Sequence, residues 1–211
     1  GLDPEAREQY HQAWTAFRQA LELEPSGRDP KNALAAALRL RQKSSLIRVA
    51  STAELILELL DNGLHVAVSV AFVESLDALR EELARDKVKT AAVFGGLGAE
   101  AREEQRLRFQ RGEVPVVLFT VEEGISLHQG EHDETPRALV IHDLRWSAIQ
   151  MAQVEGRCHR DGRFAPAYWT FADETIEERI ATVVASRIEA MKAMVGDDVE
   201  TVREITRLLT T

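Results

Sequence analysis

The sequence predicts an α/β fold in which a parallel sheet is covered by helices on both faces and is preceded by a helical appendage. From residue 65 onward, short all-apolar segments alternate with segments of helical periodicity, which is the pattern of buried parallel strands and their crossover helices. The first 48 residues show helical periodicity alone. A length of 211 residues and a hydrophobic content of 45% suffice for a buried core without disulfides or metals. We therefore expect a helical appendage at 1–48, a sheet domain at 49–195 and a C-terminal helix at 196–211.

The appendage contains two helical segments. Large apolar residues recur at helical spacing in the first of them, at Tyr10, Trp14, Phe17 and Leu21. A Pro-Ser-Gly sequence at 25–27 ends this segment. Asp29 and Pro30 are typical of an N-cap and a first helical residue, so a second helix is expected to run to Arg41 and to break at Ser44 and Ser45.

The sheet domain begins with a helix and continues as strands and helices in alternation. A capping box at 51–54 predicts the start of that helix, and Asn62 with Gly63 predicts its end. Strands are expected at 66–72, 90–94, 115–120, 138–142 and 167–171. Further helices are expected at 73–83, at 99–110, at 147–155, from Asp173 to about residue 194, and from Asp197 onward.

Small, polar and aromatic residues follow the predicted strands. In parallel sheets the carboxyl ends of the strands lie at one edge, where ligands usually bind. The residues delivered to that edge are Phe72, Gly95, Gly96, Thr120 and Asp143. This edge is therefore the first place to look for a site.

The charge and composition exclude several classes of protein. A net charge of −9 is unlike a protein that neutralises many phosphates, so any nucleic-acid contact must be a narrow track. No apolar run is long enough for a membrane span, and nothing at the start resembles a signal peptide. The single cysteine, Cys158, fits a reducing compartment. We expect a cytoplasmic protein without a membrane partner, nucleoid-associated or, if phage-encoded, in the host cytoplasm.

The densest group of reactive residue types runs from Gln153 to Arg163. It holds three arginines, Arg157, Arg160 and Arg163, with glycines at 156 and 162. The planar guanidinium suits phosphate oxygens and stays charged when water is excluded. Glycine permits tight turns and close backbone approach. A solvated basic helix end is the alternative interpretation.

This spacing, Gln-x-x-Gly-Arg-x-x-Arg-x-Gly-Arg, resembles the last conserved motif of superfamily-2 helicases and translocases. That motif lies in the second, C-terminal, of their two RecA-like domains. The resemblance extends over about residues 38–190. Within the superfamily, the sequence is similar to the Swi/Snf-like and strawberry-notch-like branches, including phage-encoded members. It rests on the order and spacing of further pieces: 66–79, Gly95 with Arg102 and Phe109, 124–128, Pro136 with Arg137, 146–148, 165–168 and 173–179. A scarcity of lysine beside arginine points to a GC-rich source such as an actinobacterium.

For the nucleotide, the resemblance implies that ATP and Mg²⁺ lie between two RecA-like domains. Arg157 and Arg160 then fall on the positions of arginine fingers that reach the γ-phosphate, with Gln153 beside them. Gly124 and Arg163 belong to the segments that bind ATP and couple its hydrolysis to movement.

For the nucleic acid, the resemblance implies a track along the predicted carboxyl edge. Gly95, Gly96, Thr120 and Phe72 fall on positions that touch one strand of DNA, or of RNA. The expected function is thus the C-terminal motor half of an ATP-dependent DNA helicase or translocase.

Two motifs of a complete motor are missing from the sequence. A phosphate-binding loop needs a lysine after glycine, and none of the five lysines follows a glycine. No D-E-x-x motif follows a suitable strand either. We therefore expect the chain to bind no cofactor tightly on its own. Its main protein partner would be the N-terminal RecA-like domain of the same parent chain, which would hold ATP and Mg²⁺.

Two other functions remain open at this point. The chain could be a catalytically silent RecA-like module that binds nucleic acid or acts as a scaffold. It could also be a small-molecule enzyme that uses Cys158 or His159 on an open α/β sheet. His128 and His132 stand among acidic residues, but this stretch reads as a solvated polar loop, so no metal site is expected.

Overall fold

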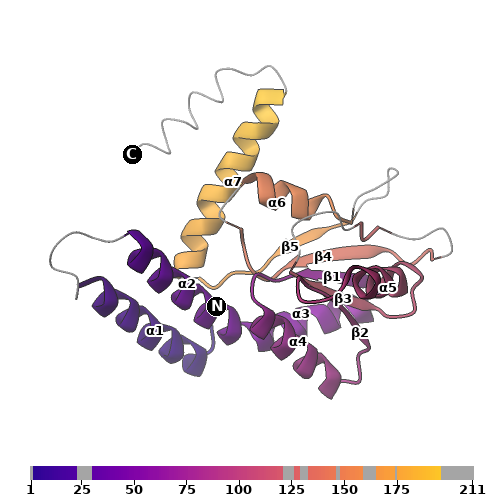
Figure 1. The fold of residues 1–211 in the computed structure, drawn as a ribbon, viewed down its shortest axis with the longest axis horizontal. Helices are drawn as coiled ribbons and strands as arrows, with labels where there is room; N and C mark the ends of the chain where they lie inside the picture. The colour runs from indigo at the N-terminus through magenta and orange to yellow at the C-terminus, as the bar shows by residue number, and fades with distance from the viewer. Residues whose placement is uncertain are drawn as a thin grey trace.

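The computed structural model describes residues 2–22, 30–120, 126–128, 133–145, 148–158, 165–173 and 175–195. Within them, one sheet has five parallel strands in the order β2-β3-β1-β4-β5, with β1 at its centre (Figure 1). The strands are β1 (His65–Ser69), β2 (Thr90–Val93), β3 (Val116–Phe119), β4 (Arg137–Ile141) and β5 (Ala167–Trp169). The predicted parallel α/β sheet is confirmed.

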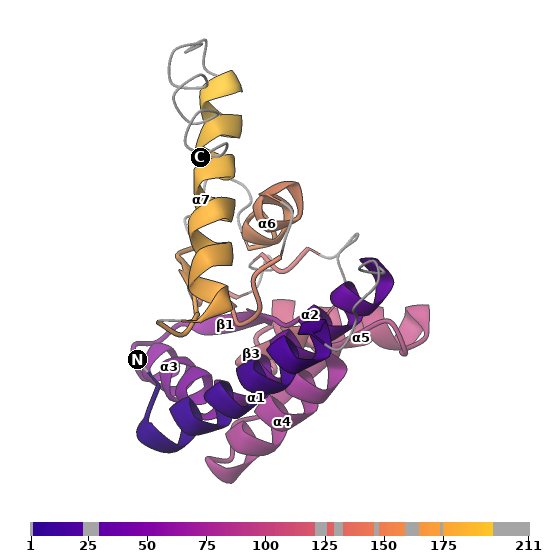
Figure 2. The ribbon, with the colours of Figure 1, turned by 90° about the vertical axis from the view of Figure 1, so that its left-hand side faces the viewer.

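The described part of the chain has seven helices. They are α1 (Pro4–Glu22), α2 (Pro30–Ile47), α3 (Val49–Asp61), α4 (Val73–Arg85), α5 (Ala99–Gln110), α6 (Ala148–Glu155) and α7 (Ile176–Val195). One core cluster joins α3 and α4 to one face of the sheet, and a second joins α5, α6 and α7 to the other. Figure 2 shows α7 rising from the sheet with α6 beside it.

The alternation of side chains along the strands explains why both faces are covered. In β1, Val66 and Val68 pack into the cluster with α3 and α4, while Ala67 packs into the opposite cluster. Successive strand residues point to opposite faces, so a strand covered on both sides is apolar throughout. Among the described residues, no helix is long and apolar enough to cross a membrane.

Two predicted boundaries near the start of the sheet domain are wrong. The helix α2 does not break at Ser44 and Ser45 but continues to Ile47. Both serines are buried, and the Ser45 hydroxyl bonds to other side chains instead of competing with the helix backbone. The predicted capping box is also absent, because α3 begins at Val49 and the Ser51 hydroxyl donates to the carbonyl of Arg48.

The start of α7 differs from the prediction as well. The helix was predicted to start with Asp173 as its cap, but it begins at Ile176. The hydroxyl of Thr175 accepts the Glu177 N–H at 3.3 Å and donates to the Ala172 carbonyl, so Thr175 is the N-cap. The helix expected from Asp197 lies outside the described residues.

The appendage forms a helical hairpin in which α1 packs along α2 (Figure 1). Tyr10 is buried, and the rings of Trp14 and Phe17 lie 5.4 Å apart. The last turns of α2 carry Arg41 and Ser45 into the interior of the sheet domain. The division of the chain at residue 48 stays a prediction.

Candidate functional site

The four predicted nucleic-acid residues lie at the carboxyl edge of the sheet. The ends of β1, β2 and β3 are adjacent there: the Val70 N–H donates to the Phe119 carbonyl, and the Thr120 N–H donates to the Val93 carbonyl, both at 3.0 Å. Phe72 follows β1 and Gly95 with Gly96 follow β2. The two glycines are exposed, and Thr120 and Phe72 are half-buried. The structure thus brings these four residues to one surface.

Two helices begin at this same edge. Phe72 is the N-cap of α4 and Gly98 is the N-cap of α5, and no side-chain hydrogen bond caps either helix start. The first N–H groups of a helix have no partner within the helix and carry a partial positive charge, which favours anions. Glu74 and Glu100 in the first turns offset part of that charge. The edge therefore brings together two helix starts whose first N–H groups have no side-chain cap.

The glycine pair keeps the backbone open. A Cβ added at Gly95 would meet no atom within 4 Å, and one added at Gly96 would lie 3.0 Å from the Phe94 ring. Neither glycine has a left-handed φ angle, so the backbone conformation does not require glycine there. What glycine provides at these positions is room for another molecule to approach the main chain.

Arg157 lies at the end of α6, away from this edge. Its N–H donates to the Val154 carbonyl at 3.1 Å, and its carbonyl accepts the Leu127 N–H at 3.0 Å. Cys158, the next residue, is buried in the core. Gln153 is exposed one turn earlier. The backbone of Arg157 is therefore fixed by the core and by the segment after β3.

That segment, residues 126–128, links Arg157 to α5. The carbonyl of Ser126 accepts hydrogen bonds from Gln110 Nε2 at 3.2 Å and from Arg106 at 3.4 Å. Gln110 is the last residue of α5, just before the chain enters β3, so Arg157 lies toward the amino ends of the strands. The predicted residues Gly124, Arg160 and Arg163 lie outside the described residues.

The cysteine-based enzyme hypothesis is contradicted by the structure. Burial raises the pKa of the Cys158 thiol to about 12. A thiol that stays protonated at neutral pH and has no access to solvent is not a nucleophile. The other residue of that hypothesis, His159, lies outside the described residues.

Asp133 corrects the expectation of a solvated loop. Its carboxylate is buried against the Arg137 guanidinium, which also packs 4.5 Å over the Phe109 ring. The pKa of Asp133 lies below its ordinary value, because hydrogen bonds from Thr135 and the charge of Arg137 outweigh burial. In the described part of the chain, no three His, Cys, Asp or Glu side chains gather as metal ligands would.

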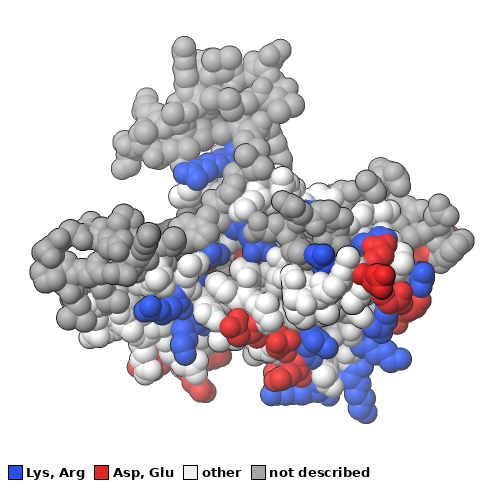
Figure 3. Space-filling model, viewed as in Figure 1, with Lys and Arg blue, Asp and Glu red and all other residues white. Residues whose placement is uncertain are grey.

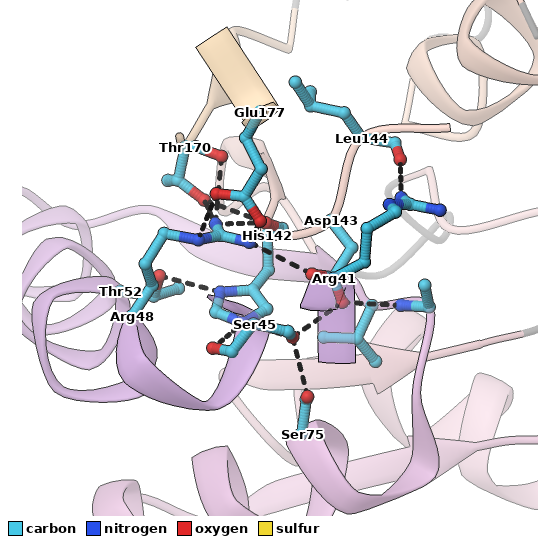
Figure 4. A network of polar contacts seen from close by, with 12 residues as sticks. Arg41, Ser45, Arg48, Thr52, Ser75, His142, Asp143, Leu144, Thr170 and Glu177 are labelled. Atoms are coloured by element: carbon cyan, nitrogen blue, oxygen red, sulfur yellow. Dashed lines mark hydrogen bonds and ion pairs between the residues drawn. The ribbon is translucent and has the colours of Figure 1, made fainter. Parts of the chain in front are cut away.

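A buried network of charged side chains was not predicted from the sequence (Figure 4). The Arg48 guanidinium lies 3.1 Å from Asp143 and 2.9 Å from Glu177. It also donates to the carbonyls of His142 and Thr170. Arg48, Asp143 and Glu177 are nearly inaccessible to solvent. We call this set, with Arg41, Ser45, Thr52 and Ser75, the polar network.

The environment of the polar network shifts the pKa values of its members. Complete burial lowers the pKa of His142 to about 4. Burial alone would raise the pKa of Asp143, but the charge of Arg48 and hydrogen bonds from Ala71 and Ser45 hold it below its ordinary value. For Glu177, burial outweighs the charge of Arg48 and raises the pKa. At neutral pH, His142 is therefore neutral and Asp143 ionised.

Comparison with known proteins agrees with this architecture. Residues 51–162 match the family model described as the helicase conserved C-terminal domain. The chain belongs to this family. The predicted C-terminal RecA-like domain of a superfamily-2 helicase is confirmed.

Two curated relatives of this helicase domain are much longer proteins. An uncharacterized ATP-dependent helicase of Mycoplasma genitalium is 25% identical over 195 residues, which are 83% of this chain and 18% of that protein. The strawberry notch homolog of Caenorhabditis elegans is 29% identical over 101 residues, which are 45% of this chain and 5% of that protein.

Solved structures of helicase domains share the fold. The SWI2/SNF2 ATPase core of Sulfolobus solfataricus in complex with dsDNA has a TM-score of 0.71 and 19% identity, and the match covers 88% of this chain and 42% of that one. Saccharomyces cerevisiae Dbp5 bound to RNA and ADP BeF3 has a TM-score of 0.53 and 16% identity, with 68% and 36% covered.

Proposed function

We propose that this helicase C-terminal domain works in an ATP-dependent DNA translocase or helicase and has two separate contact regions. Its carboxyl edge, with Phe72, Gly95, Gly96 and Thr120, would hold the DNA backbone. The end of α6 would deliver Arg157 to ATP. The observation that carries the proposal is the convergence of two helix starts without side-chain caps and an exposed Gly-Gly pair at one edge of a domain of this family.

Backbone N–H groups suit a DNA contact that is independent of sequence. Phosphates account for most protein–DNA hydrogen bonds, and helix N-termini are among their usual partners. On the face shown in Figure 3, basic and acidic side chains of the described residues lie interspersed rather than in one basic surface. This agrees with a narrow track, and we expect a salt dependence that corresponds to few phosphates.

The choice of DNA over RNA rests on the fold comparison. The neighbour in complex with dsDNA has the higher TM-score, 0.71 against 0.53 for the neighbour bound to RNA. A competition between labelled DNA and RNA duplexes for the purified chain tests this choice. Preference for the RNA duplex would reassign the substrate while leaving the domain assignment intact.

The proposed catalytic residues are Arg157 and Arg160, with Gln153 beside them. ATP and Mg²⁺ would be held by an N-terminal RecA-like domain of the parent protein, a partner that this proposal requires. An arginine at the γ-phosphate neutralises charge that develops in the transition state and typically accelerates phosphoryl transfer by about 10³–10⁵. The two backbone hydrogen bonds of Arg157 favour this role, because a fixed main chain loses little entropy when the side chain engages ATP. Gly124 and Arg163 would couple the two contact regions.

The Arg157→Lys and Arg160→Lys variants of the parent protein test this assignment. An ammonium cannot reproduce the planar fork, so kcat of DNA-stimulated ATP hydrolysis should fall by about 10²-fold or more while KM for ATP changes little. Arg85→Lys, on the exposed end of α4, is the matched control and should hydrolyse ATP normally. Near-normal kcat in both test variants would end the finger assignment.

A further inference from the structure

The segment after β4 holds the loop that precedes α4. The Asp143 carboxylate accepts the backbone N–H of Ala71 at 2.8 Å through Oδ2. Arg145, two residues later, donates to the Val70 carbonyl at 3.0 Å. Ala71 is followed by Phe72, the N-cap of α4. The conformation of this loop therefore depends on side chains that follow β4, the neighbouring strand of β1.

Both oxygens of the Asp143 carboxylate are engaged. Oδ1 accepts from Arg48 Nη2 at 3.1 Å, and Oδ2 accepts from the Ser45 hydroxyl at 3.0 Å as well as from Ala71. The side chain is 3% exposed. A carboxylate held at both oxygens in a dry site cannot rotate away, so its position is set by α2 and by Arg48.

The direction of the protons around Ser45 follows from its partners. His142 Nε2 faces the Ser45 carbonyl, which only accepts, so Nε2 carries the proton and Nδ1 accepts from the Thr52 hydroxyl. Ser45 Oγ donates to Asp143, and the Ser75 hydroxyl, 2.6 Å away, then donates to Ser45. Ser75 lies in the first turns of α4. The start of α4 is thus attached to Asp143 twice, through Ala71 and through Ser75 (Figure 4).

We propose that Asp143 is a positioning residue for the DNA-contacting edge, because it fixes the Ala71–Phe72 turn and the first turn of α4 in the orientation that receives a phosphate. This inference rests on the proposed function. Arg48 supplies the counter-charge that keeps Asp143 ionised in a buried site. Because Arg48 also pairs with Glu177, the start of α7 joins the same assembly.

The Asp143→Ala variant of the 211-residue chain tests the positioning role, with Asp77→Asn on the exposed face of α4 as control. Arg48 keeps Glu177 as a partner in this variant, so no buried cation is left alone. Amide hydrogen exchange followed by NMR should show the Ala71 N–H exchanging about tenfold faster or more, since a charge-assisted hydrogen bond is lost. The Val70 N–H, which bonds to Phe119, should keep its protection. Affinity for a fluorescently labelled DNA duplex should fall by a similar factor.

The milder Ser45→Ala variant keeps the charge pair and removes the link from Ser75. It should show the same two effects at about two- to threefold, and it decides the matter if Asp143→Ala does not fold. Unchanged exchange at Ala71, or equal acceleration at Ala71 and Val70, would overturn the positioning role. Faster exchange with unchanged DNA affinity would overturn it too. If the wild-type chain binds no DNA, the proposed function fails, and the exchange result alone still shows whether Asp143 holds the loop.

Discussion

The two halves of the carboxyl edge differ in how their polar groups are satisfied. At the ends of β1, β4 and β5, the polar network fills the space with buried, mutually bonded charges from α2, α3 and α7. At the ends of β2 and β3, the chain instead presents exposed Gly95 and Gly96 and a half-buried Thr120. We call the first half, in which the polar groups are buried, the closed half, and the second, in which they are exposed, the open half.

This difference separates a structural use of strand ends from a ligand-binding use. A parallel sheet delivers unpaired backbone groups to its carboxyl edge whatever the protein does. Where buried side chains satisfy those groups, their loss costs folding free energy. Where the groups face water, they remain available to a phosphate. Phe72 lies at the boundary between the two halves, so our proposal has a residue of the closed half, Asp143, position part of the open half.

The largest expected effect is in the closed half. Arg48→Ala should lower the free energy of unfolding by about 3–5 kcal/mol, because it leaves Asp143 and Glu177 buried without their cation. Arg85→Ala, which breaks an exposed pair with Glu82 at 2.8 Å, should cost about 0–1 kcal/mol. Urea denaturation of both variants measures the two losses. Equal losses of unfolding free energy in the two variants would mean that the buried ion pairs of Arg48 matter no more for stability than an exposed pair.

A pH titration sharpens the same contrast. The folded pKa of His142 is about 4 against an ordinary value of 6.5, so the unfolded chain binds the proton more tightly and stability falls as pH drops through this range. The free energy of unfolding should decrease by about 2 kcal/mol between about pH 7 and about pH 5 through this residue.

The His142→Gln variant should show a correspondingly flatter profile, while the lowered pKa of His65 contributes in the same direction in both proteins. Glu177, with a raised pKa, acts in the opposite direction, and its contribution cancels in the comparison because both proteins carry it. Parallel profiles for wild type and His142→Gln would contradict the burial of a neutral imidazole.

In the open half, Gly95→Ala should affect binding and not folding. A Cβ there meets nothing, so stability should stay equal or rise by about 0.4–1 kcal/mol from the stiffer unfolded chain. Affinity for a DNA duplex should fall by about three- to tenfold, the loss of one or two backbone hydrogen bonds. Gly156→Ala, away from the edge, is the control for fluorescence-anisotropy titrations. Wild-type affinity in Gly95→Ala would place the DNA elsewhere.

The smallest effect should come from the first turn of α4. Glu74→Gln removes a negative charge where a phosphate is expected, so DNA affinity should rise by about two- to fivefold at low salt. Stability should fall slightly, because a carboxylate there complements the helix dipole. Glu81→Gln, near the other end of α4, should leave affinity unchanged. The prediction is therefore that DNA affinity rises while stability falls in Glu74→Gln. A fall in both quantities would contradict a phosphate at this helix start.

Patterns in the local sequence were enough to predict most of the helices and strands. The helix at 99–110 was predicted at its observed bounds, because Gly95 and Gly96 punctuate the chain before it. In the structure, Gly112 adopts a left-handed φ angle just after its end. The strands were predicted because each is a short apolar run between turn residues. The capping box at 51–54 failed because α3 continues one turn farther toward the N-terminus, where the buried Arg48, which no local rule favours, is the N-cap.

The site was predictable only in part, for a physical reason. Gly95, Gly96 and Thr120 follow their strands directly, so the parallel topology alone brings them together. The polar network joins residues about a hundred positions apart, such as Arg48 and Asp143, and single-residue patterns carry no sign of such partners. The one local hint of the polar network is the helical spacing of Arg41, Ser45 and Arg48. The same spacing is equally typical of the solvent-exposed polar face of a helix.

The central position of β1 has a consequence for how the chain acquires its structure. Its neighbours in the sheet are β3 and β4, which both come later in the sequence, so β1 cannot pair until they have been synthesised. The hydrogen bond between Arg48 and Glu177 likewise joins residues 129 positions apart. Pairings of such long range form slowly, because the entropy of closing the loop is lost before the contacts form. A chain that emerges from the ribosome without residues 137–177 has an open edge on β1 and a lone cation at Arg48. The domain therefore reaches its native state only after most of its length has been synthesised, and until then β1 exposes an unpaired strand edge.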